Sequence, residues 1–480
     1  MSGVERTTRG VCWTCALGLT LSSVAVQADE VQRSVDADAS QIQEIVVSGQ
    51  RRAERIQDAA VAVSAFTADA LENANVSRPG DVLKLTPNVT FVQSNHPGEF
   101  FVTIRGNTQT RLGENSVALV VDGVQVLDQN SINQELFDIE QLEVLKGPQG
   151  ALYGRNAIGG AIVIQTRRPD FDEWQGKVKL GAANGTQRTG QASLSGPLTD
   201  KFAIRAGVSY LDRDGFYRNH LTGEEVDRFR DRTGFFRAMW LVSDKVTGDF
   251  RLSATDMDGG GINWVAILAL PPELGGNAEV LSGDDTSLPW VNNIRGFSRN
   301  SRRTMSMKWD IDFSHATLVS TTSHAKLKDD YGSDSYPYFY DPGQFYVLFP
   351  GDTPIGLGAQ TQELRRDAEI LTQELRLQSQ EGAALRWMIG AYYAEFDIDN
   401  VSTTGADTHN VLLGLGPHPY GSQNQTLSYL NDTNDNEAVA AFANLGYELG
   451  PLEVMASVRW DKEKKRQTDR AFPGAPDPAD

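Results

Sequence analysis

Cysteine, basic charge and long apolar runs are scarce in this 480-residue sequence, and each scarcity excludes a class of protein. The two cysteines, Cys12 and Cys15, both lie near the N-terminus. Lys and Arg number 44 against 63 Asp and Glu, which argues against a nucleic-acid binder because polyanions are held by a basic excess. The longest apolar run further along, Trp264–Leu270, is much shorter than the ~20 residues of a membrane helix. A helical membrane protein is excluded; a β-barrel, whose strands need one apolar face, is not.

Motifs for catalysis and metal binding are missing as well. The sequence has no G-x-x-x-x-G-K-[ST], H-E-x-x-H or G-x-S-x-G, and the glycine-rich turn that starts at Gly147 lacks the G-x-G-x-x-G spacing. The 6 histidines show no metal-ligand spacing. We therefore expect neither an enzyme nor a resident metal or cofactor.

The N-terminal residues 1–28 have the pattern of a secretory signal peptide. Arg6 and Arg9 precede an apolar stretch over 11–26, and small residues end it at Ala28. A buried N-terminal helix is the alternative. Cleavage after Ala28 would remove both cysteines, so the mature chain would have no disulfide and no thiol ligand. The pattern predicts an exported protein.

Residues 29–52 are predicted to form a polar, flexible leader that contains one short β-prone run. The run Ile45–Val47 lies in QEIVVSG, between the acidic leader and the basic Arg51-Arg52. A strand with nothing of its own to pair with is an edge that awaits a partner. The alternative is an ordinary first strand of the following domain.

Residues 53–170 mix helix and strand signals and are predicted to form a compact α+β domain of about 120 residues, which is large enough for its own core. Thr67 is a candidate N-cap for a first helix. Pro79 opens a second helix, whose apolar face would comprise Val82, Leu83 and Leu85. Strands are expected near 101–106, 117–123, 142–147 and 161–166, with Asp122-Gly123 as a tight turn.

From residue 171 to the end, stretches of alternating polar and apolar residues predict a β-barrel. In Phe202–Tyr210 every second side chain is apolar, and the residues between them are polar or small. One face therefore suits hydrocarbon and the other an aqueous lumen. We predict about eleven strands, joined alternately by short turns and, after the first pair, long loops, as in outer-membrane barrels. They lie near 175–183, 187–196, 201–212, 230–242, 247–256, 302–312, 316–328, 367–379, 384–398, 436–447 and 452–462.

Several motifs in this order resemble the TonB-dependent outer-membrane receptors over essentially the whole predicted mature length. EIVVSG looks like the TonB box, and VALVVDGVQV followed by DIEQLEVLKGPQGALYGRNAIGGAIVIQTRRP looks like the plug domain. TQELRLQS and GAYYAEF resemble barrel strands of the same family. The resemblance implies a membrane β-barrel of 22 antiparallel strands, with an N-terminal α+β plug domain inside it, in the bacterial outer membrane.

The resemblance also implies a function and partners. A scarce ligand, above all a ferric siderophore, would be imported with energy from TonB, which works with ExbB and ExbD. An oligosaccharide, cobalamin or an aromatic compound is an alternative ligand within the family. A passive porin is the alternative from another class, but a porin needs neither plug nor TonB box. The TonB-binding residues would be Glu44, Ile45, Val46, Val47 and Ser48.

A second set of residues carries the plug motifs. Arg105, Glu143 and Lys146 are its notable charges, and we favour a structural role for them over ligand contact because they adjoin strand and turn signals. Many family members have Arg where Lys146 stands, and Lys replaces a bidentate Arg only in part. The full set is Arg105, Gly106, Asp122, Gly123, Glu143, Lys146, Gly147, Pro148, Tyr153, Gly154, Gly159 and Gly160.

Candidate ligand contacts lie in predicted loops. His96 and Gln109 would be on plug loops that reach the outer side. A loop rich in aromatic residues between 331 and 349 offers rings that can grip a rigid ligand or a sugar face. The alternative for these rings is packing within the loop or at the lipid interface. The candidates in this loop are Tyr336, Tyr338, Phe339 and Tyr340.

The number of strands departs from the family pattern. About eleven strands are half of 22, the count is odd, and the terminal aromatic signature of the family is missing. We therefore interpret the sequence as C-terminally truncated, with a partial barrel over 171–480. Free barrel edges would leave backbone groups unpaired in lipid, so we expect that this chain as it stands neither inserts nor transports.

Overall fold

The structure, a computed structural model, places most residues that follow the predicted leader. It describes residues 45–49, 51–52, 54–74, 76, 78–93, 100–108, 116–127, 137–154, 156–219, 223–261, 295–334, 360–380, 382–406, 426–450 and 452–470. The predicted signal peptide and most of the predicted leader lie outside these residues. Within the described residues, no helix has the length and apolar character needed to cross a bilayer.

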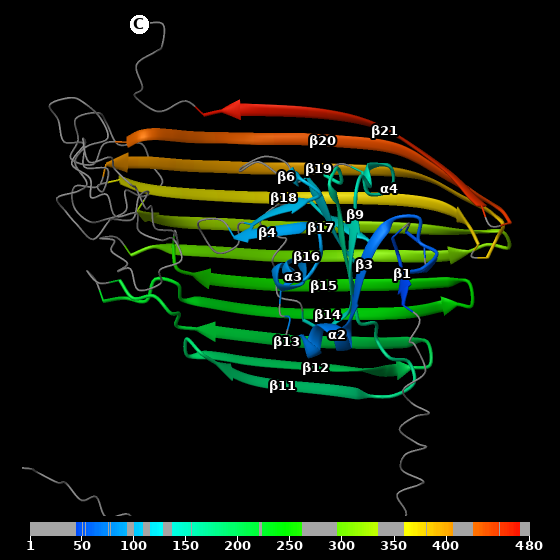
Figure 1. Cartoon of the computed structure of the whole chain (residues 1–480), viewed down its shortest axis with the longest axis horizontal. Helices are drawn as coiled ribbons and strands as arrows, with labels where there is room; N and C mark the ends of the chain where they lie inside the picture. The colour runs from blue at the N-terminus through cyan, green and yellow to red at the C-terminus, as the bar shows by residue number, and fades with distance from the viewer. Residues whose placement is uncertain are drawn as a thin grey trace, which may run out of the picture. The chain divides into compact units, whose positions relative to one another are not determined.

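Eleven antiparallel strands, each paired with its neighbours in the sequence, form one sheet that we call the wall (Figure 1). This confirms the predicted number and order of strands. The strands are Gln175–Ala183 (β11), Gln187–Thr199 (β12), Phe202–Arg213 (β13), Phe229–Ser243 (β14), Val246–Gly259 (β15), Phe297–Asp312 (β16), Ala316–Asp334 (β17), Gln360–Ser379 (β18), Leu385–Ala406 (β19), Thr426–Leu449 (β20) and Leu452–Asp469 (β21).

Several wall strands are longer than predicted, and the largest extensions are at the end that carries the long connections. β20 begins at Thr426, ahead of the predicted start at 436, and β19 continues to Ala406 instead of 398. The added segments are polar on both faces, so alternation of apolar residues could not reveal them. Backbone pairing with the neighbouring strand continues there nonetheless, as in Asn400↔Asp432.

The two faces of the wall differ as the alternation predicted. On β13, Val208 and Tyr210 are 62% and 41% exposed, whereas Arg205 and Ser209, which point to the opposite face, are 7% and 4% exposed. Directly paired residues share a face, so the cross-strand register extends this division to β14 and β15. On these strands, polar side chains point toward the segment that covers the inner face. On β17 to β20 the inner face also carries buried apolar side chains, among them Ile370, Tyr392 and Phe396.

The inner face of the wall is covered by a smaller α+β domain, the plug (Figure 1). Its main sheet has the order β3-β9-β10-β7-β8, with β7 and β10 parallel, and β4-β5-β6 form a second sheet. The elements, with the preceding strand β1, are Val46–Val47 (β1), Glu54–Arg55 (β2), Ala62–Thr67 (β3), Ala68–Asn73 (α2), Pro79–Lys84 (α3), Val89–Gln93 (β4), Phe100–Ile104 (β5), Asn107–Thr108 (β6), Val117–Val121 (β7), Val124–Val126 (β8), Ile139–Lys146 (β9), Gly150–Tyr153 (α4) and Gly160–Thr166 (β10).

Local sequence accounts for both predicted helices. The Thr67 side chain accepts a hydrogen bond from the Ala70 N–H and caps α2, and Pro79 occupies the first turn of α3. One detail was wrong: Leu85 was assigned to the apolar face of the second helix, but it is 58% exposed. α3 ends at Lys84, so Leu85 follows the last helical residue and leaves the buried face that Val82 and Leu83 share.

Gly160 shows why the plug requires glycine at the start of β10. A Cβ atom at this position would lie 2.2 Å from the Leu145 carbonyl oxygen on β9, and φ is +157°. The two strands pair directly here, with Gly160 opposite Lys146. Any side chain would force the strands apart in the middle of the sheet.

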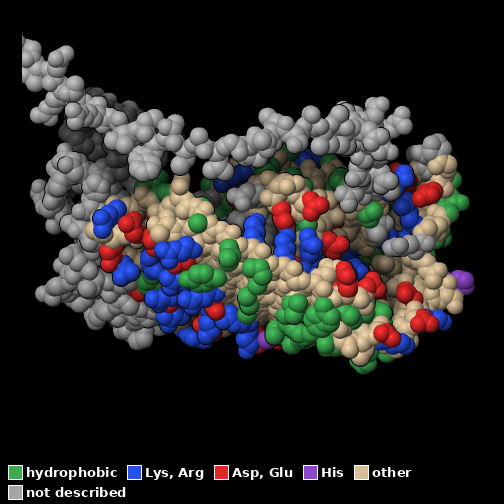
Figure 2. All heavy atoms as spheres, turned by 90° about the horizontal axis from the view of Figure 1, so that it is seen from below, with side chains coloured by type: hydrophobic (Ala, Val, Ile, Leu, Met, Phe, Trp, Pro, Cys, Tyr) green, Lys and Arg blue, Asp and Glu red, His purple; other side chains and the backbone are tan. Residues whose placement is uncertain are grey.

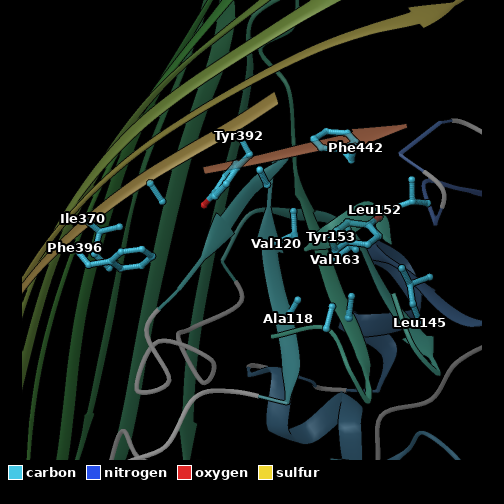
Figure 3. Packing of buried hydrophobic residues seen from close by; sticks show 14 of the residues in the cluster. Ala118, Val120, Leu145, Leu152, Tyr153, Val163, Ile370, Tyr392, Phe396 and Phe442 are labelled. Carbon is cyan, nitrogen blue, oxygen red and sulfur yellow. The ribbon is translucent and has the colours of Figure 1, made fainter. Parts of the chain in front are cut away.

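The hydrophobic core is divided between the plug and its contact with the wall. One cluster lies within the plug and includes Val82, Leu119, Leu142 and Ile162. A second cluster joins the plug to strands β17 to β20 (Figure 3). In it, wall residues Ile370, Tyr392, Phe396 and Phe442 belong to the same buried group as the plug residues Val120, Leu152, Tyr153 and Val163. The plug is therefore packed against the wall.

The outward apolar face makes a prediction about stability in lipid. Met307 on β16 pairs with Phe250 and Thr322, in the middle of the apolar rows. In a full-length version with a closed barrel, replacing Met307 with Arg places a charge in hydrocarbon and should destabilise the protein in a bilayer by about 2–4 kcal/mol. Urea unfolding in lipid vesicles measures this change. As a control, Leu198→Arg, at an exposed leucine beside the turn between β12 and β13, should leave stability unchanged.

Candidate functional site

The run predicted to be the TonB box is paired in a small hairpin on the plug. Val46 and Val47 form β1, which pairs antiparallel with β2, Val46 opposite Arg55 and Val47 opposite Glu54. The run therefore has a partner within the chain, since β2 lies in the predicted plug domain, although the hairpin is separate from the five-stranded plug sheet. Its role in binding TonB stays a prediction. Val47 is buried, whereas Val46 is 47% exposed.

Ser48, which follows the hairpin strand, is held by the carboxylate of Glu143. The Ser48 N–H donates to both oxygens of Glu143, with N···O distances of 2.9 and 3.0 Å. The Ser48 hydroxyl donates to Glu143 Oε1 at 3.0 Å. A carboxylate that receives backbone and side-chain donors together makes stronger hydrogen bonds than a neutral acceptor does. Glu143 therefore fixes the end of the box segment to β9.

Three further side chains complete this arrangement, which we call the Ser48 clasp (Glu143, Gln141, Gln165 and Tyr153). Gln165 Nε2 donates to Ser48 Oγ at 3.0 Å, and the Tyr153 hydroxyl donates to the Ser48 carbonyl oxygen at 3.1 Å. Gln141 Nε2 donates to the Val46 carbonyl oxygen at 2.8 Å. β9, β10 and α4 thus all contribute to holding Val46 and Ser48.

The clasp is buried, and burial sets its electrostatics. Glu143 and Tyr153 are 0% and 3% exposed. Burial raises the pKa of the Glu143 carboxyl, although the hydrogen bonds from Ser48, Gln141 and Gln165 act in the opposite direction. Burial likewise raises the pKa of the Tyr153 hydroxyl, which therefore remains a donor. The carboxylate depends on the donors around it for its charged form.

The two arginines after the box segment reach the wall. Arg51 Nη1 pairs with Glu374 Oε1 of β18 at 3.0 Å, Arg51 Nε donates to the Leu152 carbonyl oxygen, and the guanidinium lies over the Tyr153 ring, 4.7 Å from its centre. Arg52 donates to Ser379 Oγ of β18 and to the carbonyl oxygen of a β19 residue. The chain is thus attached to the plug at Ser48 and to the wall a few residues later.

Further ion pairs join plug to wall along β13 to β15. Asp122, in the predicted turn after β7, lies 3.3 Å from Arg251 and 3.7 Å from Arg237. Burial works to raise the pKa of Asp122, but these two arginines and the hydrogen bonds from Thr166 outweigh it and hold the pKa below its usual value. Two further pairs are Asp138 with Arg205 and Arg78 with Asp231.

Arg105 and Lys146 lie on the side of the plug away from Ser48's carboxylate partner. Arg105 Nη1 would be 3.2 Å from a Cβ on Gly147, and burial followed by the charge of Arg105 lowers the pKa of the Lys146 amine. Within the described residues, neither cation forms an ion pair. The bidentate carboxylate pairing considered for Lys146 stays a prediction.

The glycine and proline members of the plug motifs occupy turns. Positive φ angles occur at Gly106, Gly123, Gly147 and Gly154. The Gly154 turn faces the wall, where a Cβ would lie 2.8 Å from the Arg459 guanidinium of β21. Gly159 donates to the Ser116 carbonyl oxygen, and Pro148 lies between β9 and α4. Their role as a family motif stays a prediction.

Several predicted site residues lie outside the described residues. These are Glu44 of the box segment and all candidate ligand contacts: His96, Gln109, Tyr336, Tyr338, Phe339 and Tyr340. In the part of the chain that the structure places, no group of three or more His, Cys, Asp or Glu side chains could hold a metal ion.

Sequence reasoning missed Gln141, Gln165, Arg51 and Arg52 as contact residues. Gln141 and Glu143 are two residues apart on β9 and share a face, and Gln165 pairs with Gln141 across the sheet. Polar residues at every second position of an otherwise apolar strand are a signal that could have been used. No local pattern could have identified the wall partners of the two arginines.

Comparison with known proteins agrees with the resemblance. Residues 55–161 match the family described as TonB-dependent Receptor Plug Domain. The chain is 28% identical over 233 residues to the iron-regulated outer membrane virulence protein of Vibrio cholerae, covering 45% of this chain and 33% of that protein. It is 32% identical over 207 residues to the pesticin receptor of Yersinia pestis, covering 42% and 27%.

Solved structures show the same fold. The ferric yersiniabactin uptake receptor FyuA from Yersinia pestis aligns with a TM-score of 0.66 at 18% identity, covering 85% of this chain and 60% of that one. The siderophore receptor PiuA from Acinetobacter baumannii aligns with a TM-score of 0.68 at 16% identity, covering 88% and 60%. The chain therefore spans less than two thirds of the length of the relatives it matches.

These findings identify the class of protein. The chain contains a TonB-dependent receptor plug domain over residues 55–161, and this domain is followed by eleven antiparallel strands that share the fold of the aligned receptor structures. Among the relatives, those named for a ligand include receptors for ferrioxamine B and ferric enterobactin.

The Ser48 clasp can be tested by removing its carboxylate. Glu143→Ala removes the acceptor for the Ser48 N–H and hydroxyl, and hydrogen bonds to a charged group are worth about 1.5–3 kcal/mol. Amide hydrogen exchange at Ser48 should become about ten- to a hundredfold faster. Glu140→Ala, at an exposed position of the same strand, is the matched control and should leave the exchange rate unchanged. Unaltered exchange in Glu143→Ala would exclude the clasp.

Docking of the hairpin should weaken as pH rises. Burial is the main cause that raises the pKa of Glu54 on β2 from 4.5 to about 7. The charge of Arg386 opposes this rise, and the charges of Glu453, Glu143 and Asp58 add to it. Between about pH 4.5 and 7, the Glu54 carboxyl is therefore protonated in the docked hairpin and ionised in the undocked hairpin. The free energy that favours docking falls as pH rises through this window.

A nitroxide on Val46→Cys reports this change. Its electron paramagnetic resonance spectrum should show higher mobility at pH 8 than at pH 5, and Glu54→Gln should reduce the difference. Equal mobility at both pH values in the chain with native Glu54 would show that ionisation of Glu54 does not control docking.

Proposed function

We propose that this protein takes part in TonB-dependent uptake of a ferric siderophore across the bacterial outer membrane. The proposal rests on one observation: the short strand Val46–Val47 and the following Ser48 are attached by hydrogen bonds to β9, which has a partner strand on both sides in the main plug sheet. The siderophore assignment is supported by the names of the relatives. An oligosaccharide, cobalamin or an aromatic compound remains the alternative ligand.

The segment has the properties that pairing with a partner strand requires. Val46 is half-exposed, and its partner β2 is only two residues long, so the hairpin has few hydrogen bonds to exchange. Two-stranded hairpins of this size are marginal in water. A TonB strand could replace β2 beside Val46 and Val47 by β-augmentation, the mode in which main-chain hydrogen bonds provide the affinity.

A pull on this segment would act on the core of the plug. Ser48 is held by Glu143 on β9, and β9 lies between β3 and β10 in the main sheet. Force applied to Ser48 would therefore reach the strand with partners on both sides. In this mechanism the energy is mechanical. The family resemblance implies that TonB supplies it together with ExbB and ExbD. A passive porin has no use for such an attachment.

The proposal can be tested at Val46. Val46→Pro removes one N–H donor and fixes φ, so it should abolish pairing with the periplasmic domain of TonB. Val46→Thr retains the N–H and the β-branched shape and is the matched control. Isothermal titration measures TonB binding. Iron-55 accumulation from ferric siderophore measures uptake by cells that express each variant in a full-length version of the receptor.

Three outcomes are informative. Loss of TonB binding and of iron uptake in Val46→Pro, with both retained in Val46→Thr, is the expected result. Unimpaired TonB binding in Val46→Pro would contradict the assignment of the box. Normal TonB binding by the native chain, without iron uptake from any siderophore but with uptake of cobalamin or an oligosaccharide, would replace the ligand and keep the mechanism.

A further inference from the structure

The plug meets the two sides of the wall in different ways. Against β17 to β20 the contact is closed by packed apolar side chains. Against β11 and β12 a cavity of about 210 Å³ lies between plug and wall, and α2 with the segments next to β9 and β10 forms its plug side. Figure 1 shows α2 at the end of the plug that faces these first strands. We call this cavity the seam.

The β11–β12 side of the seam is lined by polar or small side chains. Four directly paired positions line it, and they follow each other from the end of the long connections toward the short turns. The pairs are Ala183↔Gln187, Gly181↔Thr189, Lys179↔Gln191 and Lys177↔Ser193. Such side chains do not seal a contact by apolar packing, and their polar atoms need water or a solute as a partner. The seam therefore runs along most of β11 as a polar gap.

The acidic side chains that line the seam, Glu72 and Asp138, are both paired. Glu72 of α2 forms an ion pair with Lys177 of β11, and Asp138 forms one with Arg205 of β13. Figure 2, which views the molecule from the side of β11, shows basic and acidic side chains close together in the middle of this face. Arg205 does not itself line the seam, so the charge of Asp138 is balanced from outside it.

Two cations of the seam have no such partner. Arg167, which follows β10, and Lys179 on β11 form no ion pair within the part of the chain that the structure places. Their charges reach Glu72 nonetheless. The hydrogen bond from Lys177, followed by the charges of Lys177, Arg167 and Lys179, holds the pKa of Glu72 below its usual value against the effect of burial. The seam therefore has an excess of positive charge that an anion can balance.

The ion pair that crosses the seam is exposed. Both side chains of the Lys177–Glu72 pair are 46% exposed, and exposed pairs contribute little because water screens them. An anionic group of a ligand can therefore take the place of Glu72 beside Lys177. On the plug side, Leu71, Phe137 and Ile139 also line the seam and offer apolar contact to an uncharged part of the same ligand.

The plug sheet connects the seam with the box segment. Ser48 is held by Glu143 on β9, and β9 pairs with β3 at the edge of the main plug sheet. α2 follows β3 directly, and its buried residue is Leu71. A displacement of β9 would therefore shift β3 and with it α2, which forms one side of the seam.

We propose that the seam is the passage by which a negatively charged ligand moves past the plug. Arg167 and Lys179 attract the anion, Lys177 exchanges Glu72 for it, and a shift of α2 widens the passage. This inference rests on the proposed function and narrows its ligand to solutes with net negative charge.

The charge of the seam can be measured on the purified chain without transport. Ser193→Cys, in a chain that also carries Cys12→Ser and Cys15→Ser, places one thiol on the wall side of the seam. Its rates of reaction with an anionic and a cationic methanethiosulfonate of similar size are compared. Ser243→Cys, at an exposed serine before the turn between β14 and β15, is the matched control.

The preference for the anionic reagent should be about tenfold greater at Ser193→Cys than at Ser243→Cys, the effect of one or two unbalanced charges nearby. Lys179→Gln should remove most of this difference, and Lys179→Arg should preserve it because the charge is kept. High salt should reduce it as well, since the seam is open to water.

Passage is tested by uptake in a full-length version of the receptor. Lys179→Glu combined with Arg167→Glu should lower the maximal rate of uptake of an anionic ferric siderophore about tenfold. Capture of this ligand by cells treated with a protonophore should not change, because the seam lies beside the plug and not among the external loops. Uptake of a ferric siderophore without net charge should fall much less. Lys201→Glu, at an exposed lysine between β12 and β13, is the control and should leave both rates unchanged.

Three results would overturn the proposal. The first is an equal preference of Ser193→Cys and Ser243→Cys for the anionic reagent. The second is normal uptake of the anionic siderophore by the Lys179→Glu, Arg167→Glu variant while Val46→Pro still blocks it, which would refute the passage and keep the proposed function. The third is an equal loss for both siderophores, which would leave these cations a structural role. Absence of uptake by the native full-length receptor would refute the proposed function and the passage together.

Discussion

Backbone hydrogen bonding in hydrocarbon is the constraint on which this structure depends. A strand that crosses a bilayer has no water to satisfy its N–H and C=O groups, so each strand must pair along its length with the next. The wall meets this demand through one continuous antiparallel ladder from β11 to β21. Since successive side chains of a strand point to opposite faces, the ladder also separates an apolar outer face from a polar inner face.

The polar inner face determines how the plug is held. This face includes the charged residues Arg205, Asp231 and Arg237, and the plug places a side chain of opposite charge beside each of them. These ion pairs connect β13 to β15 to the plug, and apolar packing against β17 to β20 completes the contact. Buried ion pairs contribute little net stability but are costly to break singly, so each pair opposes local separation of the plug from the wall.

The Ser48 clasp links this packing to function. It holds Ser48 on a carboxylate whose charged form is disfavoured by burial. The attachment is therefore specific in geometry, while burial of the carboxylate reduces its net contribution to stability. The adjoining arginines end on the wall, at Glu374 and Ser379. The chain therefore has two anchors of different kinds within a few residues: one on the plug and one on the wall.

Much of the fold could be predicted because its signals are local. Alternation in Phe202–Tyr210 and its counterparts identified eleven strands and their lipid face, and Thr67 and Pro79 marked two helix starts. β3 and β4 were missed, since short runs such as Ala62–Thr67 become strands only by pairing with β9. Leu85 was misassigned because a period of 3.6 residues does not show where a helix ends.

The site divides in the same way. The sequence by itself predicted a short strand at Ile45–Val47 and assigned Glu143 to the plug motifs; the structure pairs Val46 and Val47 with β2, and binding of a partner protein stays a prediction. Only the tertiary structure decided that Glu143 receives the Ser48 N–H, 95 residues away in sequence, and that Arg51 meets Glu374, 323 residues away. A residue pattern predicts which face of a strand or helix a side chain lies on. The partner it meets there depends on how separate segments are brought together by the ladder of the wall and the packing of the plug.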